Sequence, residues 1–200
     1  MPGQLKVDEI VDTAGTGPVT ALNGLKADSL TNIAGTAGYP LMRLETAKTA
    51  TGTSVDFTGI PGWAKKITVM LNGVSTNGTS IPVVRLGSGT VQTTGYKYSV
   101  MQIINSTTSL GSAANSSTGI ILWASGWQAA YDLIGNITLV LVTGTTWSAS
   151  AVLGSTGTVQ GTTCAGNVAL SGAIDRLQIT TSNGTDAFDA GTINILIEGY

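Results

Sequence analysis

The sequence predicts an all-β protein, an antiparallel jelly-roll-like β-sandwich that follows a short extended N-terminal segment. From Ser54 onward, apolar and polar residues alternate with the period of two expected of a half-buried strand. Turn signals such as Asn72-Gly73 and Asn77-Gly78 separate the apolar stretches. One stretch, 126–134, favours a helix, but it is too short to organise a fold. About eight to ten short strands joined by such turns are typical of a sandwich.

A repeat of about 20 residues occurs twice within the first 45 residues. Leu5-Lys6-x-Asp8-x-Ile10 recurs as Leu25-Lys26-x-Asp28-x-Leu30, and Ala14-Gly15-Thr16 recurs as Ala34-Gly35-Thr36. Two such copies are too small to bury an apolar face of their own, so we expect this segment to gain order by packing on another chain or a larger surface. Its candidate docking residues are Leu5, Val7, Ile10, Leu22, Leu25 and Leu30.

The chain therefore divides into three predicted parts. Residues 1–45 form the docking segment, the small polar residues of 46–53 form a linker, and residues 54–200 form a domain able to fold alone.

Nine stretches of the predicted domain carry a strand pattern. They are 66–71, 83–86, 91–104, 120–123, 137–142, 147–153, 168–170, 174–181 and 193–197. Pro82 precedes the second stretch, as it often does in an edge strand, and Gly95 predicts a kink in the third. The stretch 137–142 is apolar on both faces, which predicts a central strand. Leu177 and Ile179 are expected to point inward.

Composition argues against several classes of function. Charged residues make up 10% of the chain, the net charge is −2, and Lys65-Lys66 is the only adjacent pair of cations. Phosphate neutralisation by a basic stripe is therefore not expected, and we predict no nucleic-acid partner. The N-terminus lacks an apolar signal region, and the apolar runs are too short to span a bilayer. We predict no membrane insertion.

The chain contains no His and a single Cys, which excludes Cys–His nucleophiles and His-based metal sites. Cys164 is expected to be a small, partly buried apolar residue. A glycosidase with two carboxylates stays open, and Asp186 and Asp189 form the nearest pair. We favour a turn for these residues, because Asp side chains bond their own backbone. A Ca²⁺ site that adds Asn183 is a further reading, although the spacing is not that of an EF-hand. We predict no cofactor and no resident metal.

Seven aromatic side chains raise the alternative of sugar binding. They are Trp63, Tyr96, Tyr98, Trp123, Trp127, Tyr131 and Trp147. A sandwich core or a subunit interface also needs large apolar side chains, and we favour that role for the set. Trp123 lies in an apolar stretch, and Trp127 and Tyr131 are expected to form one contact on the short helix. Trp63 follows Pro61-Gly62 and is the aromatic residue most expected to be exposed.

Two segments carry a family resemblance. They contain Phe-x-Gly-Ile-Pro at 57–61 and Phe-Asp-x-Gly-x-Ile-Asn at 188–194. Together with the surrounding residues 54–198, they resemble the β-rich displayed domain of tailed-bacteriophage tail fibres and head fibres. The N-terminal repeat resembles the virion-docking segments that precede such domains. The resemblance implies a virion location, a homotrimer, and a role in attachment or decoration. The chain lacks the long shaft of a typical tail fibre, which favours a small fibre on the capsid surface.

We therefore expect a non-enzymatic virion structural protein, a small homotrimeric capsid decoration or head-fibre protein. Residues 1–45 would dock and trimerise on the major capsid protein or another virion protein, and residues 54–200 would be displayed. The alternative is a tail fibre or receptor-binding adhesin for host-surface glycans, with Trp63, Asp186 and Asp189 in its receptor-facing loops. A glycan-degrading enzyme is a third hypothesis, which rests on the carboxylates alone.

Overall fold

The structure is a computed structural model that describes residues 41–104, 108–157 and 160–199. The chain divides into two units, Met1–Gly38 and Tyr39–Tyr200, and all described residues belong to the second. Its strands are β1 (Leu41–Leu44), β2 (Lys48–Thr49), β3 (Ser54–Thr58), β4 (Lys66–Thr76), β5 (Pro82–Ser88), β6 (Thr90–Val91), β7 (Tyr96–Ile104), β8 (Thr108–Ser117), β9 (Ile120–Ile121), β10 (Leu133–Thr143), β11 (Thr146–Ser155), β12 (Gln160–Ala169), β13 (Arg176–Thr181) and β14 (Phe188–Gly199). The described residues contain no helix that is long and apolar enough to cross a membrane.

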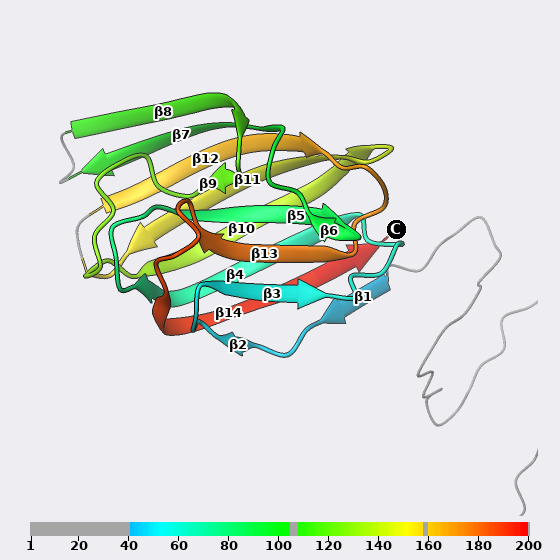
Figure 1. The fold of residues 1–200 in the computed structure, drawn as a ribbon, viewed down its shortest axis with the longest axis horizontal. Coiled ribbons are helices and arrows are strands. Elements are labelled where there is room, and N and C mark those ends of the chain that lie inside the picture. Colours follow the sequence, from blue (N-terminus) through cyan, green and yellow to red (C-terminus); the bar gives the residue numbers. More distant parts are fainter. Residues whose placement is uncertain (1–40, 105–107, 158–159, 200) are drawn as a thin grey trace, which may run out of the picture. The chain divides into compact units, whose positions relative to one another are not determined.

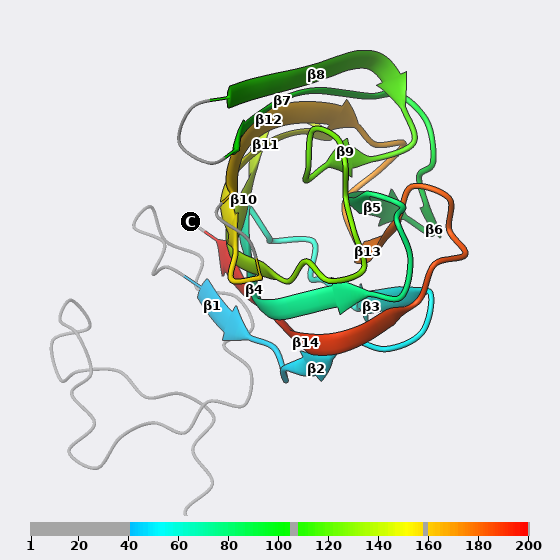
Figure 2. The ribbon, with the colours of Figure 1, turned by 90° about the vertical axis from the view of Figure 1, so that its left-hand side faces the viewer.

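These strands form two antiparallel sheets that face each other (Figure 1). The larger sheet has the order β1-β14-β4-β10-β11-β12-β7-β8, and β2 also pairs with β14. The smaller sheet has the order β3-β13-β5-β6, and β9 also pairs with β5. Figure 2 shows the larger sheet curving around the strands of the smaller one. The prediction of an all-β antiparallel sandwich is thus confirmed, whereas jelly-roll connectivity stays a prediction.

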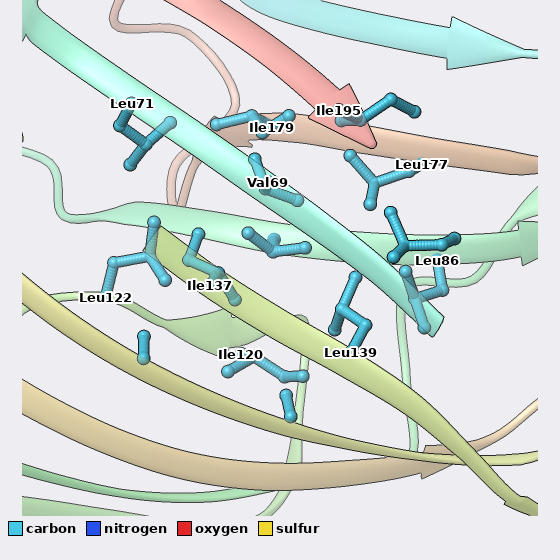
Figure 3. Close-up of a cluster of buried hydrophobic side chains, with 14 of the residues drawn as sticks. Val69, Leu71, Leu86, Ile120, Leu122, Ile137, Leu139, Leu177, Ile179 and Ile195 are labelled. Carbon is cyan, nitrogen blue, oxygen red and sulfur yellow. The ribbon is translucent and has the colours of Figure 1, made fainter. Parts of the chain in front are cut away.

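The core lies between the sheets and is built from the inward residue of each alternating pair (Figure 3). Val69, Ile137 and Ile195 project from the larger sheet, and none of them is exposed. Leu177 and Ile179 project from β13 in the smaller sheet, at 0% and 1% exposure, as their spacing predicts. β-Branched side chains suit this half-buried, pleated surface, so the period of two in the sequence sets which face each strand buries.

β10 is central, as the apolar stretch 137–142 predicts. It pairs with β4 on one side and with β11 on the other.

The helix expected at 126–134 is wrong. This segment is irregular up to Leu133, where β10 begins. Its aromatic side chains explain the difference. The indole N–H of Trp127 donates to Thr76 Oγ1 at 2.8 Å, and its ring meets that of Tyr131 edge-on at 5.8 Å. The predicted contact between Trp127 and Tyr131 is present, but tertiary packing and not a helix brings the two rings together.

The long strand expected over 91–104 is two strands in different sheets. β6 pairs with β5 in the smaller sheet, and β7 pairs with β12 and β8 in the larger one. Gly95 has a φ of 81°, a conformation that glycine adopts without strain. The kink predicted at Gly95 is therefore part of a crossing between the layers.

β5 is an interior strand of the smaller sheet and not the predicted edge strand. β13 pairs with one side of β5, while β9 and β6 pair with two parts of the other side. Pro82 is tolerated because it is the first residue of the strand, where a missing N–H is least disruptive.

The compact unit also begins earlier than residue 54. β1 pairs with the end of β14, with Leu41 opposite Gly199, and β2 pairs with Thr192 and Ile193. The last residues of the predicted docking segment and part of the predicted linker are thus strands of the larger sheet.

Candidate functional site

The loop before β14 is organised by one side chain, that of Asn183. Its Oδ1 accepts hydrogen bonds from the backbone N–H groups of Thr185 and Asp186, at 3.0 and 3.1 Å, and from Thr181 Oγ1 at 2.9 Å. Gly184 follows with a φ of 69°. An Asn that bonds its own downstream backbone is a turn-forming arrangement, in agreement with the turn predicted here.

Asp186 joins this loop to the loop after β4. Its carboxylate accepts a hydrogen bond from the backbone N–H of Ser80 and another from Asn183 Nδ2, each at 2.8 Å. The hydrogen bond from Asn183 is the main reason that the pKa of Asp186 lies below its ordinary value. The carboxylate also packs against Gly78, where a Cβ would lie 2.1 Å from Asp186 Oδ2. Asp186 therefore acts as a structural bridge between two loops.

Asp189 makes a different contact. Its side chain is exposed and accepts a hydrogen bond from the Ser75 hydroxyl on the neighbouring strand. The pairing of β14 with β4 shifts register between Phe188 and Ala190, so Asp189 occupies a bulge. Phe188 beside it is 3% exposed and fills the edge of the core. The two carboxylates are thus engaged by separate groups. Among the described residues, no group of three or more acidic or Cys side chains could hold a metal ion.

Trp63 lies at the other end of β14 from these carboxylates. It is half-buried, packs against the core, and covers Gly199, where a Cβ would lie 2.7 Å from the indole Cε3. β14 is 12 residues long, so its two ends lie roughly 30 Å or more apart. Trp63 therefore does not share one receptor-facing surface with Asp186 and Asp189.

The other aromatic residues with large buried surfaces belong to the core. Trp123, Trp147 and Tyr96 are at most 2% exposed, and Trp127 is 2% exposed. Trp123 meets Trp127 edge-on, with ring centroids 5.6 Å apart. Sugar stacking requires an open ring face, so the buried tryptophans have the structural role that the sequence favours.

Cys164 is buried on the inward side of β12, at 6% exposure, as a small apolar residue would be. Burial raises the pKa of its thiol to about 11. Because the thiolate is the reactive form, this thiol is held in its inert state at neutral pH.

Sequence reasoning missed an exposed apolar surface on the outer face of the larger sheet. Met101 and Ile103 on β7 and Val152 on β11 point outward, and they line a hollow of about 210 Å³ together with residues of β12. Alternation along β7 could have indicated it. Neighbouring side chains of a strand face opposite sides of the sheet, so a buried Gln102 places Met101 and Ile103 outside.

The candidate docking residues lie outside the described part of the chain. They are Leu5, Val7, Ile10, Leu22, Leu25 and Leu30. The two-copy repeat lies outside it as well.

Comparison of the chain with protein-family models, curated proteins and solved structures finds no match.

Proposed function

We propose that this chain is a non-enzymatic structural protein of a tailed-phage virion, a small homotrimeric capsid decoration or head-fibre protein. Its N-terminal segment would dock on the major capsid protein or another virion protein. The β-sandwich would be displayed outward from the particle.

The observation that carries the proposal is the position of the two segments on which the family resemblance rests. Phe57 of the first segment lies on β3 in the smaller sheet, and Phe188 of the second begins β14 in the larger sheet. Both side chains are 3% exposed and belong to the same core. The resembling residues therefore include core positions of the sandwich, so the resemblance rests on residues that the fold requires and not on the surface alone.

Three carboxylates of the unit provide a second line of support. Asp132, Asp175 and Asp186 each accept a hydrogen bond from a backbone N–H in a loop: that of Gly157 at 2.6 Å, of Gly89 at 3.0 Å and of Ser80 at 2.8 Å, in that order. Hydrogen bonds from side chains are the main reason that the pKa of each of these carboxyls is lowered. The acid of a glycosidase requires a raised pKa, so these groups are suited to holding loops and not to donating protons.

The experiment that tests the proposal is to locate the chain on the intact particle. Mass spectrometry of purified virions would first establish whether the chain is present. Labelled antibody against the sandwich would then be imaged on the particle. We expect signal over the head. Absence of the chain from purified virions would refute the proposal, and signal at the tail tip would replace decoration with the adhesin alternative.

The tail-fibre alternative has its own assay, the binding of purified protein to host cells. An adhesin should bind, and added surface polysaccharide should compete. A decoration protein should leave the cells unlabelled at the same concentration.

A further inference from the structure

The second half of β7 has an inverted pattern, with apolar residues outside and a polar residue inside. Met101 and Ile103 are 50% and 48% exposed, whereas Gln102 between them is 1% exposed. Gln102 Oε1 accepts hydrogen bonds from the backbone N–H groups of Ala124 and Ser125, each at 3.2 Å. These bonds, together with the burial of Tyr96 and Val100 on the same side of β7, specify its register, so the outward position of Met101 and Ile103 is a fixed feature of the fold.

A hollow opens beside these residues. It has a volume of about 210 Å³ and is lined by Met101, Ile103, Val152, Leu153, Gly161, Thr162 and Thr163. Val152 on its wall is 71% exposed, the highest value among the large apolar residues exposed in the described part of the chain. An apolar cavity of about 150 Å³ is enough to hold a benzene ring in a protein, so this hollow can accept an apolar side chain.

Two glycines lie beside the hollow at positions where the backbone conformation does not require glycine. Gly154 on β11 lies opposite Gly161 on β12, and neither has a positive φ. A Cβ would lie 3.7 Å from its nearest neighbour at Gly154 and 3.4 Å at Gly161, which are ordinary contacts. The protein could therefore accommodate side chains here. Glycine inside a strand weakens it and often marks the close approach of another chain, so this pair indicates an external contact.

The chemistry of the face selects the type of partner. Among the described outward residues of β7, β10, β11 and β12, Lys97 is the single charged residue, and the hollow has neither a charged nor an aromatic side chain in its lining. Glycans are recognised by aromatic faces and polar groups, and phosphates by cations, so this lining fits neither. It fits an uncharged protein surface that supplies apolar side chains.

We propose that this outer face is the contact between copies of the chain, with exposed apolar side chains of one copy seated in the hollow of the next. The face carries both the projections, Met101 and Val152, and the recess beside Gly161, so one part of it can contact a different part of the same face on the next copy, as a closed three-fold ring requires. The four strands β7, β10, β11 and β12, at a spacing of ~4.8 Å and with ~20 Å of each exposed, give a low-charge face of about 380 Å², roughly half of what one partner contributes to a standard interface, and β8 extends it at its edge. The inference rests on the homotrimer of the proposed function, and it adds a contact surface on the sandwich to the trimerisation expected of residues 1–45.

The test measures the association of the full chain by light scattering and sedimentation at micromolar concentration. Val152→Glu places an unpaired charge in an apolar contact, and we expect it to raise the dissociation constant about a hundredfold or more. Thr58→Glu is the matched control, because Thr58 is also an exposed β-branched strand residue but lies on β3 of the other sheet. This control should associate like wild type.

A second variant separates association from folding. Gly161→Val should fill the hollow and weaken association, while the thermal unfolding of the separated subunit stays unchanged or improves, because valine suits a strand better than glycine. Far-ultraviolet circular dichroism should show the same strand content in every variant.

The outcomes distinguish the interface from the function on which it rests. If wild type, Val152→Glu and Gly161→Val all form the same oligomer, the face is not the interface, and the homotrimer must use another surface. A monomeric wild type would overturn both the interface and the homotrimer. The virion location would still be decided separately, by the presence of the chain in purified particles.

Discussion

Tyr96 connects the two sheets through its hydroxyl group, and Tyr96→Phe removes that group alone. The hydroxyl accepts a hydrogen bond from the backbone N–H of Leu86 at 2.7 Å. It lies 3.1 Å from the carbonyl oxygens of Leu86 and Gln92, and it can donate its proton to either. Tyr96 and Leu86 are both fully buried, so water cannot take over these bonds.

The role of the hydroxyl follows from a gap along β5. On the side of β5 that faces away from β13, β9 pairs with Val83 and Val84, and β6 pairs with Gly87 and Ser88. Leu86 lies between these two partners. Its carbonyl also accepts a hydrogen bond from the N–H of Gln92, but its own N–H donates to Tyr96. The variant would leave that buried N–H without an acceptor.

The expected loss of stability can be worked out from these contacts. A buried N–H left without a partner costs about 1–3 kcal/mol, and the lost donation by the hydroxyl adds about 1 kcal/mol. We therefore expect the free energy of unfolding to fall by about 2–4 kcal/mol. For a chain of this size, each kcal/mol changes Tm by about 2–4 °C, so Tm should fall by about 4–16 °C.

The assay is urea denaturation together with a thermal melt, both followed by tryptophan fluorescence and circular dichroism. Tyr131→Phe is the matched control. Its hydroxyl is half-buried and accepts one hydrogen bond, from Gln160 Nε2 at 3.2 Å, so we expect a loss below about 1 kcal/mol. A free energy of unfolding for Tyr96→Phe within 0.5 kcal/mol of wild type would contradict the reasoning, because that is less than the smallest cost of an unpaired buried N–H.

Three further predictions concern other buried or bridging groups. Burial raises the pKa of Tyr96 to about 12 and that of Cys164 to about 11. The unfolded chain releases these protons at lower pH, so the stability that they contribute should be fully present below pH 9 and fall from pH 9 to 12. Denaturant titrations across this range would measure the fall, and a free energy of unfolding that does not change with pH would count against it. Asp186→Ala should speed amide hydrogen exchange at Ser80 and leave core amides unchanged, because the carboxylate accepts a hydrogen bond from the Ser80 N–H. An unchanged exchange rate at Ser80 would show that this hydrogen bond does not hold the loop. Gln102→Leu should lower the free energy of unfolding by about 1–3 kcal/mol, because the backbone N–H groups of Ala124 and Ser125 lose their acceptor. If urea denaturation gave the same free energy of unfolding as wild type, these hydrogen bonds would not stabilise the fold.

The parts of the fold that the sequence predicted are those where apolar residues alternate strictly. Within 67–71 of β4, 137–139 of β10, 177–179 of β13 and 193–197 of β14, every second residue is a large aliphatic side chain, and the structure buries it. Such a pattern determines both the type of element and the face that it buries. The central position of β10 was also predictable, because it is apolar on both faces.

β8 and most of β12 were missed for the opposite reason. β12 buries Thr162, Cys164 and Val168, which differ in polarity, and small residues lie between them. β8 has the sequence Thr-Ser-Leu-Gly-Ser-Ala-Ala-Asn-Ser-Ser, which shows no apolar period. Both strands are specified by backbone pairing with β7, and such long-range pairing leaves little trace in local composition.

The candidate receptor loops show a similar limit. The turn at Asn183 was predictable from local chemistry, because it involves side chains that bond nearby backbone. The distance between Trp63 and Asp186 was not, since it depends on which ends of β14 their loops approach. Local pattern therefore identified each loop but could not establish whether the loops share a surface.

The exposed apolar residues of β7 show why local pattern also missed the surface that we propose for function. A rule that places apolar residues inside would assign Met101 and Ile103 to the core and Gln102 to solvent. The structure reverses this assignment because the loop after β9 offers two backbone N–H groups that only a polar side chain can satisfy. Satisfying them places two large apolar side chains on the outer face, beside a strand that carries glycine where a side chain would fit. The residue that completes this part of the core thus also creates the apolar surface that we propose as the contact between copies, and this is why the outer face and not the loops is the first place to mutate.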